Sequence, residues 1–148
     1  MKKGLKILVL LMLSFAFLSS TQLNAKKNLG IGVIVGYPTG LSLKFNNFPV
    51  MGIAWNVGGY FHVHADYWII NKTLADPINW YLGIGGKLRL WTSQSSSNIG
   101  LGLRIPIGLQ WFPFNNLELF GEIVPGLSFL PGTAFDWDAA VGARFYLN

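Results

Sequence analysis

Cysteine, charge and long apolar runs are all scarce in this sequence of 148 residues. Cysteine is absent, which excludes disulfides, thiolate metal sites, cysteine nucleophiles and a lipid anchor on cysteine. Charged residues make up only 11%, whereas a typical soluble protein has roughly 25%. Beyond the N-terminal segment no apolar run reaches the about 20 residues that a membrane helix needs. The body of the chain is therefore not expected to cross a membrane as a helix.

The residues that are present favour membrane strands over a soluble core. Hydrophobic residues make up 51% of the chain and aromatic residues 15%, and there are 18 glycines. The formal charge of +5 includes three lysines among the first six residues. From Lys26 onward the chain has eight cationic and six anionic residues, which gives a net charge of +2. A nucleic-acid-binding protein is expected to carry a strong basic patch, so we expect no nucleic-acid partner.

The N-terminal segment has the layout of a secretory signal peptide. A basic start with Lys2, Lys3 and Lys6 precedes an apolar stretch, Ile7–Leu18, and small or polar residues follow as far as Ala25. An uncleaved membrane anchor is the alternative, but an apolar stretch of 12 residues is short for a span. We predict a cleaved signal peptide at residues 1–25 and one domain at residues 26–148.

From Leu29 onward apolar side chains recur at every second residue, which is the period of a β-strand. Turn residues such as Asn46-Asn47 and Asn115-Asn116 separate the alternating segments and suit short hairpins. Longer links are expected at Asn71–Asn79 and Thr92–Asn98. The pattern predicts an antiparallel meander of about eight strands and no helix. The strands are expected at residues 29–36, 41–46, 51–58, 60–70, 80–91, 99–112, 117–130 and 134–147.

Two architectures fit strands that have one apolar face. In a soluble barrel or sandwich this face points inward, and in a membrane barrel it points to lipid. Two features favour the membrane. The segment Ile99–Trp111 exceeds the 9–11 residues that cross a bilayer. The opposite face is rich in glycine, which weakens a solvated strand but fits a narrow barrel interior.

Aromatic residues near strand ends are typical of interfacial girdles: Tyr60, Phe61, Trp80, Tyr81, Trp91, Trp111, Phe112, Phe135, Trp137, Phe145 and Tyr146.

The same assignment places the charged residues in the lumen. Five cations are balanced there by five anions, and two histidines lie on the same face. Because confined charges are costly unless they are paired, we expect an interior filled by ion pairs and not an open channel. The predicted lumen network comprises Lys44, His62, His64, Asp66, Lys87, Arg89, Arg104, Glu118, Glu122, Asp136, Asp138 and Arg144.

The final segment, Ala134–Asn148, alternates apolar residues through Val141, Ala143, Phe145 and Leu147. With the strand number and the alternation from Leu29 onward, it resembles the small outer-membrane barrels of the OmpA/OmpX type, and especially the short barrels of spirochaetes. The resemblance implies a closed, antiparallel up-and-down transmembrane β-barrel of about eight strands in the bacterial outer membrane. It also implies outer-membrane lipid and the barrel assembly machinery as partners. That machinery recognises a last strand ending in an aromatic residue, whereas this chain ends in Asn148.

Two groups of residues could carry chemistry. His62, His64 and Asp66 share one face of a strand at i, i+2 and i+4, so they could bind a metal or act as acid and base. A hydrogen-bonded lumen network explains them more simply. Ser42, Ser128 and His62 could belong to a lipid-modifying enzyme, but their spacing does not connect them. We therefore predict no catalytic, cofactor or metal site.

The predicted function is a structural or surface-interaction role in the outer membrane. If the N-terminus is periplasmic, the outer loops are short, at residues 37–40, 58–59, 92–98 and 131–133. Of these, Thr92–Asn98 could contact an extracellular ligand. A lipid-modifying enzyme, a narrow pore and a soluble lipocalin-like ligand carrier remain the alternatives, because a shared fold does not fix function.

Overall fold

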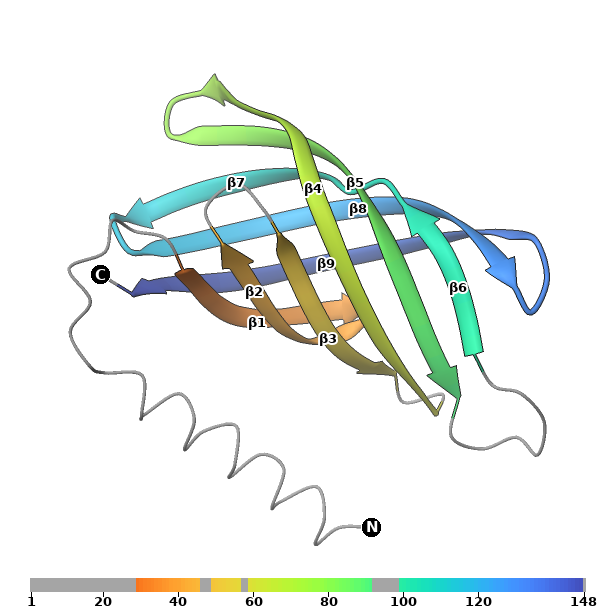
Figure 1. The fold of residues 1–148 in the computed structure, drawn as a ribbon. Coiled ribbons are helices and arrows are strands. Elements are labelled where there is room, and N and C mark those ends of the chain that lie inside the picture. Colours follow the sequence, from red (N-terminus) through yellow and green to blue (C-terminus); the bar gives the residue numbers. More distant parts are fainter. Residues whose placement is uncertain (1–28, 46–48, 57–58, 92–98, 148) are drawn as a thin grey trace, which may run out of the picture.

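The computed structural model describes residues 29–45, 49–56, 59–91 and 99–147 (Figure 1). The predicted signal peptide at residues 1–25 lies outside these ranges, as do the predicted turn at Asn46-Asn47 and the predicted loop Thr92–Asn98. Within the described ranges, no helix has the length and hydropathy required to cross a membrane.

The described residues form an all-β fold in which every paired strand is antiparallel. Strands follow one another along the chain through short connections, as expected for an up-and-down arrangement. The strands are β1 (Leu29–Tyr37), β2 (Thr39–Phe45), β3 (Val50–Asn56), β4 (Tyr60–Ala75), β5 (Ile78–Trp91), β6 (Ile99–Arg104), β7 (Ile107–Phe114), β8 (Leu117–Leu130) and β9 (Ala134–Leu147).

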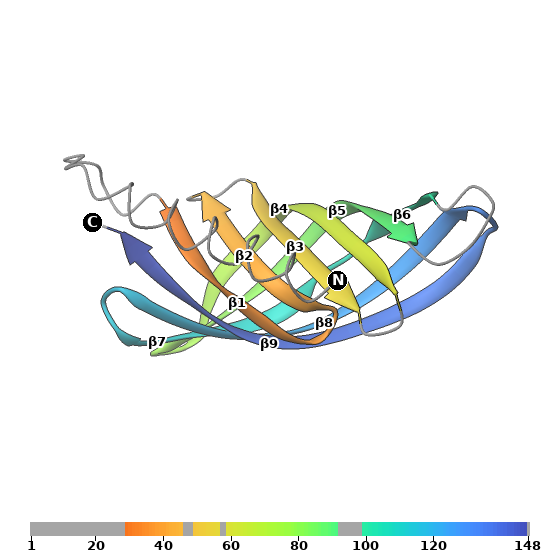
Figure 2. The same ribbon diagram turned by 90° about the horizontal axis from the view of Figure 1, so that it is seen from below.

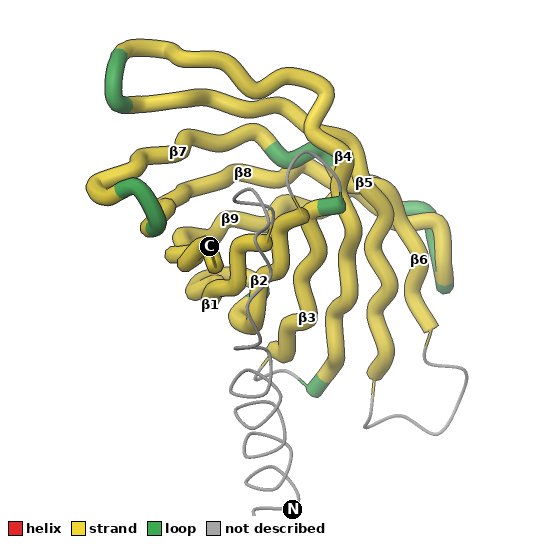
Figure 3. The backbone as a smooth tube through the Cα atoms, turned by 60° about the vertical axis from the view of Figure 1, so that its left-hand side comes forward, coloured by secondary structure: helices red, strands yellow, loops and turns green. Residues whose placement is uncertain are grey.

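The strand pairings run around a complete ring (Figures 2 and 3). β1, the first strand of the meander, pairs with β9, the last, so the two ends of the meander meet. In between, β4 pairs with β5, so the ring has no gap there. Following the register partners of Ile34 through β2 and β3 leads to His62 on β4. Following them through β9, β8, β7 and β5 leads to Thr73, 11 residues further along β4. Such an offset is the stagger that tilted strands need to close on themselves.

The sixth predicted strand, at residues 99–112, is divided in two, so the described chain has nine strands. β6 and β7 follow one another along the same side of the ring, and each pairs with both β5 and β8. The break falls at Ile105-Pro106, because proline has no N–H to donate to the ladder. Backbone bonds still bridge the break, from Gly83 N to Pro106 O at 2.8 Å and from Ile105 N to Pro125 O at 2.9 Å.

The expected long link at Asn71–Asn79 is wrong, because strand structure occupies most of it. β4 continues to Ala75 and β5 begins at Ile78, which leaves a two-residue turn. The pairing of β4 with β5 shifts between Trp68 and Ile70 and again between Thr73 and Ala75. These irregularities interrupt the simple alternation on which the prediction relied. The hairpin lies at the end of the ring where β9 ends and β1 begins (Figure 1).

Apolar side chains face outward and charged side chains face inward. On β6 and the residues that follow it, Leu101, Leu103, Ile105 and Ile107 are each 44–45% exposed. Arg104, between two of them, is 1% exposed. Thus the alternation in the sequence corresponds to two faces, and the charged face is the buried one.

Glycines on the inner face leave space for large side chains of neighbouring strands. A Cβ atom at Gly142 would overlap the ring of Phe120, and one at Gly52 would overlap the ring of His64. The outward Gly86 has open space instead, because a Cβ atom there would meet no other atom within 4 Å. The inner glycines are therefore required by packing across the ring, as expected for a narrow interior.

Two aromatic residues assigned to the predicted girdles lie inside the ring. Tyr81 is fully buried and Tyr146 is 8% exposed. Each lies an even number of residues from the charged residues of its strand, so each shares their face (its parity along the strand is the same). Each hydroxyl donates to a carboxylate: Tyr81 to Glu122 and Tyr146 to Glu118. Their position near strand ends suggested an interface, whereas their parity places them in the polar interior.

Candidate functional site: the ion-paired interior

The ten charged residues predicted for the lumen all take part in ion pairs inside the ring. They form three clusters, each named here for the residue at its centre. The Glu118 cluster contains Lys44, Glu118 and Arg144. The Arg104 cluster contains Asp66, Arg104 and Glu122. The Asp136 cluster contains Lys87, Arg89, Asp136 and Asp138.

In the Glu118 cluster, one fully buried carboxylate binds two cations. Lys44 Nζ lies 3.2 Å from Glu118 Oε2, and Arg144 Nη1 lies 2.8 Å from Glu118 Oε1. Gln110 Nε2 donates to Glu118 Oε1 at 2.6 Å, and the Tyr146 hydroxyl donates to Glu118 Oε2. Four donors from β2, β7 and β9 thus converge on one side chain of β8, which satisfies a carboxylate that burial would otherwise penalise.

Aromatic rings surround the cations of the Glu118 cluster. The rings of Trp68 and Tyr81 are stacked, with centroids 3.9 Å apart and planes inclined by 12°. Lys44 Nζ lies 4.1 Å from the centroid of the Trp68 ring, and Arg144 Cζ lies 3.7 Å from that of Phe120. The cations therefore have aromatic faces as well as a carboxylate as partners.

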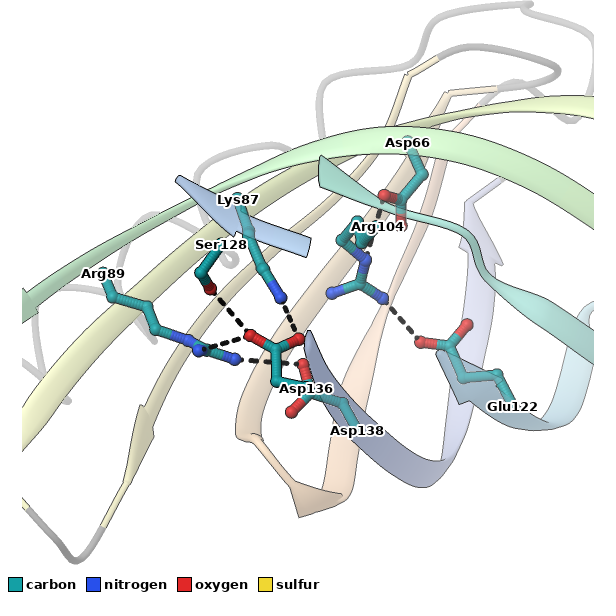
Figure 4. A network of polar contacts seen from close by, with 8 residues as sticks. All are labelled: Asp66, Lys87, Arg89, Arg104, Glu122, Ser128, Asp136 and Asp138. Carbon is teal, nitrogen blue, oxygen red and sulfur yellow. Dashed lines mark hydrogen bonds and ion pairs between the residues drawn. The ribbon is translucent and has the colours of Figure 1, made fainter. Parts of the chain in front are cut away.

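In the Arg104 cluster, one guanidinium binds two carboxylates (Figure 4). Arg104 Nε lies 3.1 Å from Asp66 Oδ1, and Arg104 Nη2 lies 3.0 Å from Glu122 Oε1. The Tyr81 hydroxyl donates to the other oxygen of Glu122 at 2.7 Å. Because Tyr81 also stacks on Trp68, it links the Arg104 cluster to the Glu118 cluster.

The Asp136 cluster (Figure 4) lies near the start of β9, toward the end of the ring opposite to the paired residues Leu29 and Leu147. Arg89 Nη1 lies 2.9 Å from Asp136 Oδ2, and Arg89 Nη2 lies 3.4 Å from Asp138 Oδ2. Lys87 Nζ pairs with Asp136 Oδ1, and Ser128 Oγ donates to Asp136 Oδ2 at 2.8 Å. The cluster therefore connects β5 with β9 across the ring.

The clusters differ in charge although the set as a whole is neutral. The Glu118 cluster has two cations and one anion, the Arg104 cluster has one cation and two anions, and the Asp136 cluster has two of each. The Glu118 cluster thus has one extra positive charge and the Arg104 cluster one extra negative charge. Tyr81 connects these two clusters, because it donates to Glu122 and stacks on Trp68. Charge is thus balanced over the interior and not within each cluster.

The histidines lie beside the Arg104 cluster. The rings of His62 and His64 meet edge to face with centroids 5.2 Å apart. His64 Nε2 lies 4.0 Å from Asp66 Oδ2, which is too long for a hydrogen bond. Among the described residues, no group of three or more His, Cys, Asp or Glu side chains has a metal-binding arrangement. The spacing of the three residues along β4 therefore does not by itself create a metal site.

Of the three residues considered for a lipid-modifying enzyme, the two serines form hydrogen bonds with other lumen residues. Ser42 Oγ accepts a hydrogen bond from Arg144 Nε at 2.8 Å, and Ser128 donates to Asp136. His62 is fully buried and contacts His64. Neither serine forms a hydrogen bond with His62, whose two ring nitrogens have no hydrogen-bond partner among the described residues.

Seven further residues contact the clusters and were not part of the predicted network: Ser42, Trp68, Tyr81, Gln110, Phe120, Ser128 and Tyr146. The signal that could have found them is strand parity. Gln110 lies six residues after Arg104 and therefore on the same face, and Trp68 lies two residues after Asp66. A search restricted to charged residues and histidine passes over such neutral partners.

Comparison with known proteins supports the fold. Residues 20–145 match a family described as a protein of unknown function, DUF3996, and the chain belongs to this family. No curated protein matches the chain. A crystal structure of the N-terminal β-barrel domain of Pseudomonas aeruginosa OprF is similar, with a TM-score of 0.51 and 17% sequence identity. The similarity covers 80% of this chain and 95% of the OprF domain. It supports the β-barrel fold.

Proposed function

We propose that this chain is an integral β-barrel protein of the bacterial outer membrane, exported by a cleaved signal peptide and having a structural or surface-interaction role. Outer-membrane lipid and the barrel assembly machinery are its proposed partners. The observation that carries the proposal is the orientation of β6, where Leu103 is 45% exposed and the neighbouring Arg104 is 1% exposed. A soluble protein buries its apolar face, whereas a membrane barrel turns it toward lipid.

The second part of the proposal is that the interior is plugged. Eight-stranded barrels are just wide enough for side chains to fill them. Here ion pairs connect β5 with β9, and β2 with β8, across the ring. Moving an ion through this interior would require separating charge pairs in a region of low dielectric constant, which is costly. We therefore propose a protein that does not conduct and that has no catalytic centre.

Membrane fractionation with heat-modifiable gel migration tests the first part. The mature protein is expected in the outer-membrane fraction, with an unheated band that migrates differently from the boiled band. Recovery in the aqueous periplasmic fraction without detergent would instead favour a soluble lipocalin-like barrel.

Planar-bilayer recording tests the second part. The wild-type protein is expected to give no discrete conductance steps. Replacing Lys87, Arg89, Asp136 and Asp138 together with alanine keeps the net charge and removes the Asp136 cluster. If that variant conducts while the wild type does not, the ion pairs are the plug; steps from the wild type would show a narrow pore.

A further inference from the structure

We propose that the interior binds ordered water beside His62, an inference that rests on the proposed plugged interior. His62 is fully buried, yet neither of its ring nitrogens has a hydrogen-bond partner among the described residues. Buried polar groups are nearly always hydrogen-bonded, and ordered water is a common partner where no protein group is within reach. The imidazole of His62 therefore marks a binding site for a small polar ligand.

Unpartnered nitrogens of other side chains accompany those of His62. Arg104 is 1% exposed and His64 is 4% exposed, and Arg104 Nη1 and His64 Nδ1 have no hydrogen-bond partner among the described residues. The same is true of Arg89 Nε, although the two terminal nitrogens of Arg89 pair with Asp136 and Asp138. The unmet hydrogen bonds thus belong to His62, to its neighbour on β4 and to the arginines of two different clusters.

The register of the strands places His62 between Arg89 and two very small residues. His62 pairs with Arg89 on β5, and its ring meets that of His64 edge to face. On the other side it pairs with Ala54 on β3, which pairs with Gly40 on β2. Ala54 has a single methyl group and Gly40 has no side chain, so these two strands take up little of the inner face there. A small ligand suits this position.

The hydrogen-bonding chemistry of an imidazole selects water among small ligands. In its neutral form the ring of His62 has one N–H donor and one nitrogen acceptor. A metal ion could bind only the acceptor nitrogen, and a chloride ion could bind only the donor, so each would leave one nitrogen unmet. Water both donates and accepts hydrogen bonds, and it can therefore satisfy both nitrogens.

The charges of the interior also favour a neutral ligand. Cations outnumber anions within electrostatic range of His62, and they repel a metal ion: the groups are Lys87, Arg89, Arg104 and Asp136. An anion would meet Asp66, whose Oδ2 lies 4.0 Å from His64 Nε2. The ten charged residues of the interior already balance, five against five, and water leaves that balance unchanged.

Water beside His62 would connect two parts of the plug. The ion pairs of the described residues hold the Arg104 cluster and the Asp136 cluster together internally, but none of them joins one cluster to the other. A water molecule that accepts from Arg89 Nε or Arg104 Nη1 and bonds to His62 forms this connection. The plug is then one continuous polar network that includes water.

Two substitutions with side chains of equal length separate a wet interior from a dry one. His62→Gln keeps a donor and an acceptor, whereas His62→Met has no N–H. If water is bound, the arginine nitrogens lose it only in His62→Met, so the equilibrium constant for folding should be about tenfold lower than in His62→Gln. If the interior is dry, the order reverses, because an unpartnered buried amide is costly and a thioether is not.

NMR of the full mature protein in dodecylphosphocholine micelles detects the water directly. The carbon-bound ring protons of His64 are present in all three proteins and do not exchange with solvent. Cross-relaxation between these protons and water, with the sign of a slowly exchanging molecule, is expected in the wild type and in His62→Gln and should be lost in His62→Met. The wild-type spectrum carries the test by itself if a variant does not fold.

Three results would overturn the inference. Absence of slowly exchanging water in the wild type, or His62→Met folding more stably than His62→Gln, would show a dry interior. Nitrogen shifts of His62 that change when chloride is replaced by sulfate, or when Zn²⁺ is added, would assign the site to an ion. Conductance steps from the wild type together with rapidly exchanging water would refute the plug itself, whereas a silent barrel without bound water refutes the water site alone.

Discussion

Glu118 and Arg144 are direct register partners on β8 and β9, and their side chains meet at 2.8 Å inside the ring. Both are essentially fully buried. Lys44 reaches the same carboxylate from β2, so a single anion pairs with two cations from different strands. The pairing thus links strands that are far apart in the sequence.

Removing the charge of Glu118 should strongly destabilise the fold. Glu118→Gln keeps the shape of the side chain and leaves Lys44 and Arg144 without a carboxylate. Breaking a buried ion pair on one side typically costs about 3–5 kcal/mol. Urea unfolding in lipid vesicles, followed by tryptophan fluorescence, measures the free energy of unfolding. Asp76→Asn in the exposed turn is the control and should change it by less than about 0.5 kcal/mol; equal effects would contradict the assigned role.

An added methyl group should be tolerated on the outer face and not on the inner face. At Gly142 a Cβ atom would overlap the Phe120 ring and the carbonyl oxygen of Val33. Overpacking of this kind costs about 1–3 kcal/mol. Gly142→Ala should therefore lower the free energy of unfolding, and Gly86→Ala should leave it nearly unchanged. The same unfolding assay compares the two, and an equal loss would argue against the inward orientation of Gly142.

A charge on the outward face should be costly only if that face meets lipid. Leu103→Arg is expected to destabilise the folded protein in vesicles by about 2–4 kcal/mol if the residue lies near the bilayer midplane. Ala75→Arg, at the exposed tip of β4, should cost about 0–1 kcal/mol. If both substitutions are neutral, the outward face lies in water and the proposed membrane location is wrong.

The Tyr81 hydroxyl should stabilise the interior separately from its ring. Tyr81→Phe keeps the stack on Trp68 and removes the hydrogen bond to Glu122. Hydrogen bonds to charged groups contribute about 1.5–3 kcal/mol, so a loss of this size is expected. Tyr37→Phe, at a residue that is 50% exposed, is the control. Unfolding free energies that fall equally in both variants would show that the contact to Glu122 adds no stability.

Local alternation was enough to predict which residues share a face of each strand. Side chains of a strand alternate between two faces, so the position of Arg104 between Leu103 and Ile105 separates the polar from the apolar side. The same reasoning identified all ten charged residues of the interior. It also implied the inward glycines, because large inward side chains need small neighbours.

Alternation could not determine how the strands are matched with one another. It does not show that β4 extends to Ala75 or that the sixth strand breaks at Ile105-Pro106. These features depend on register and on the 11-residue offset with which the ring closes on β4. Register is a relation between distant segments and has no local signature.

The sequence by itself determined the two faces of each strand and the neutral set of buried charges, because both follow from residue type and a period of two. Only the tertiary structure decided that Glu118 takes two cations while Arg104 takes two carboxylates. The physical reason is that partner choice depends on which side chains the closed ring brings within a few ångströms. That distance is set by stagger and strand order, which the alternation leaves open.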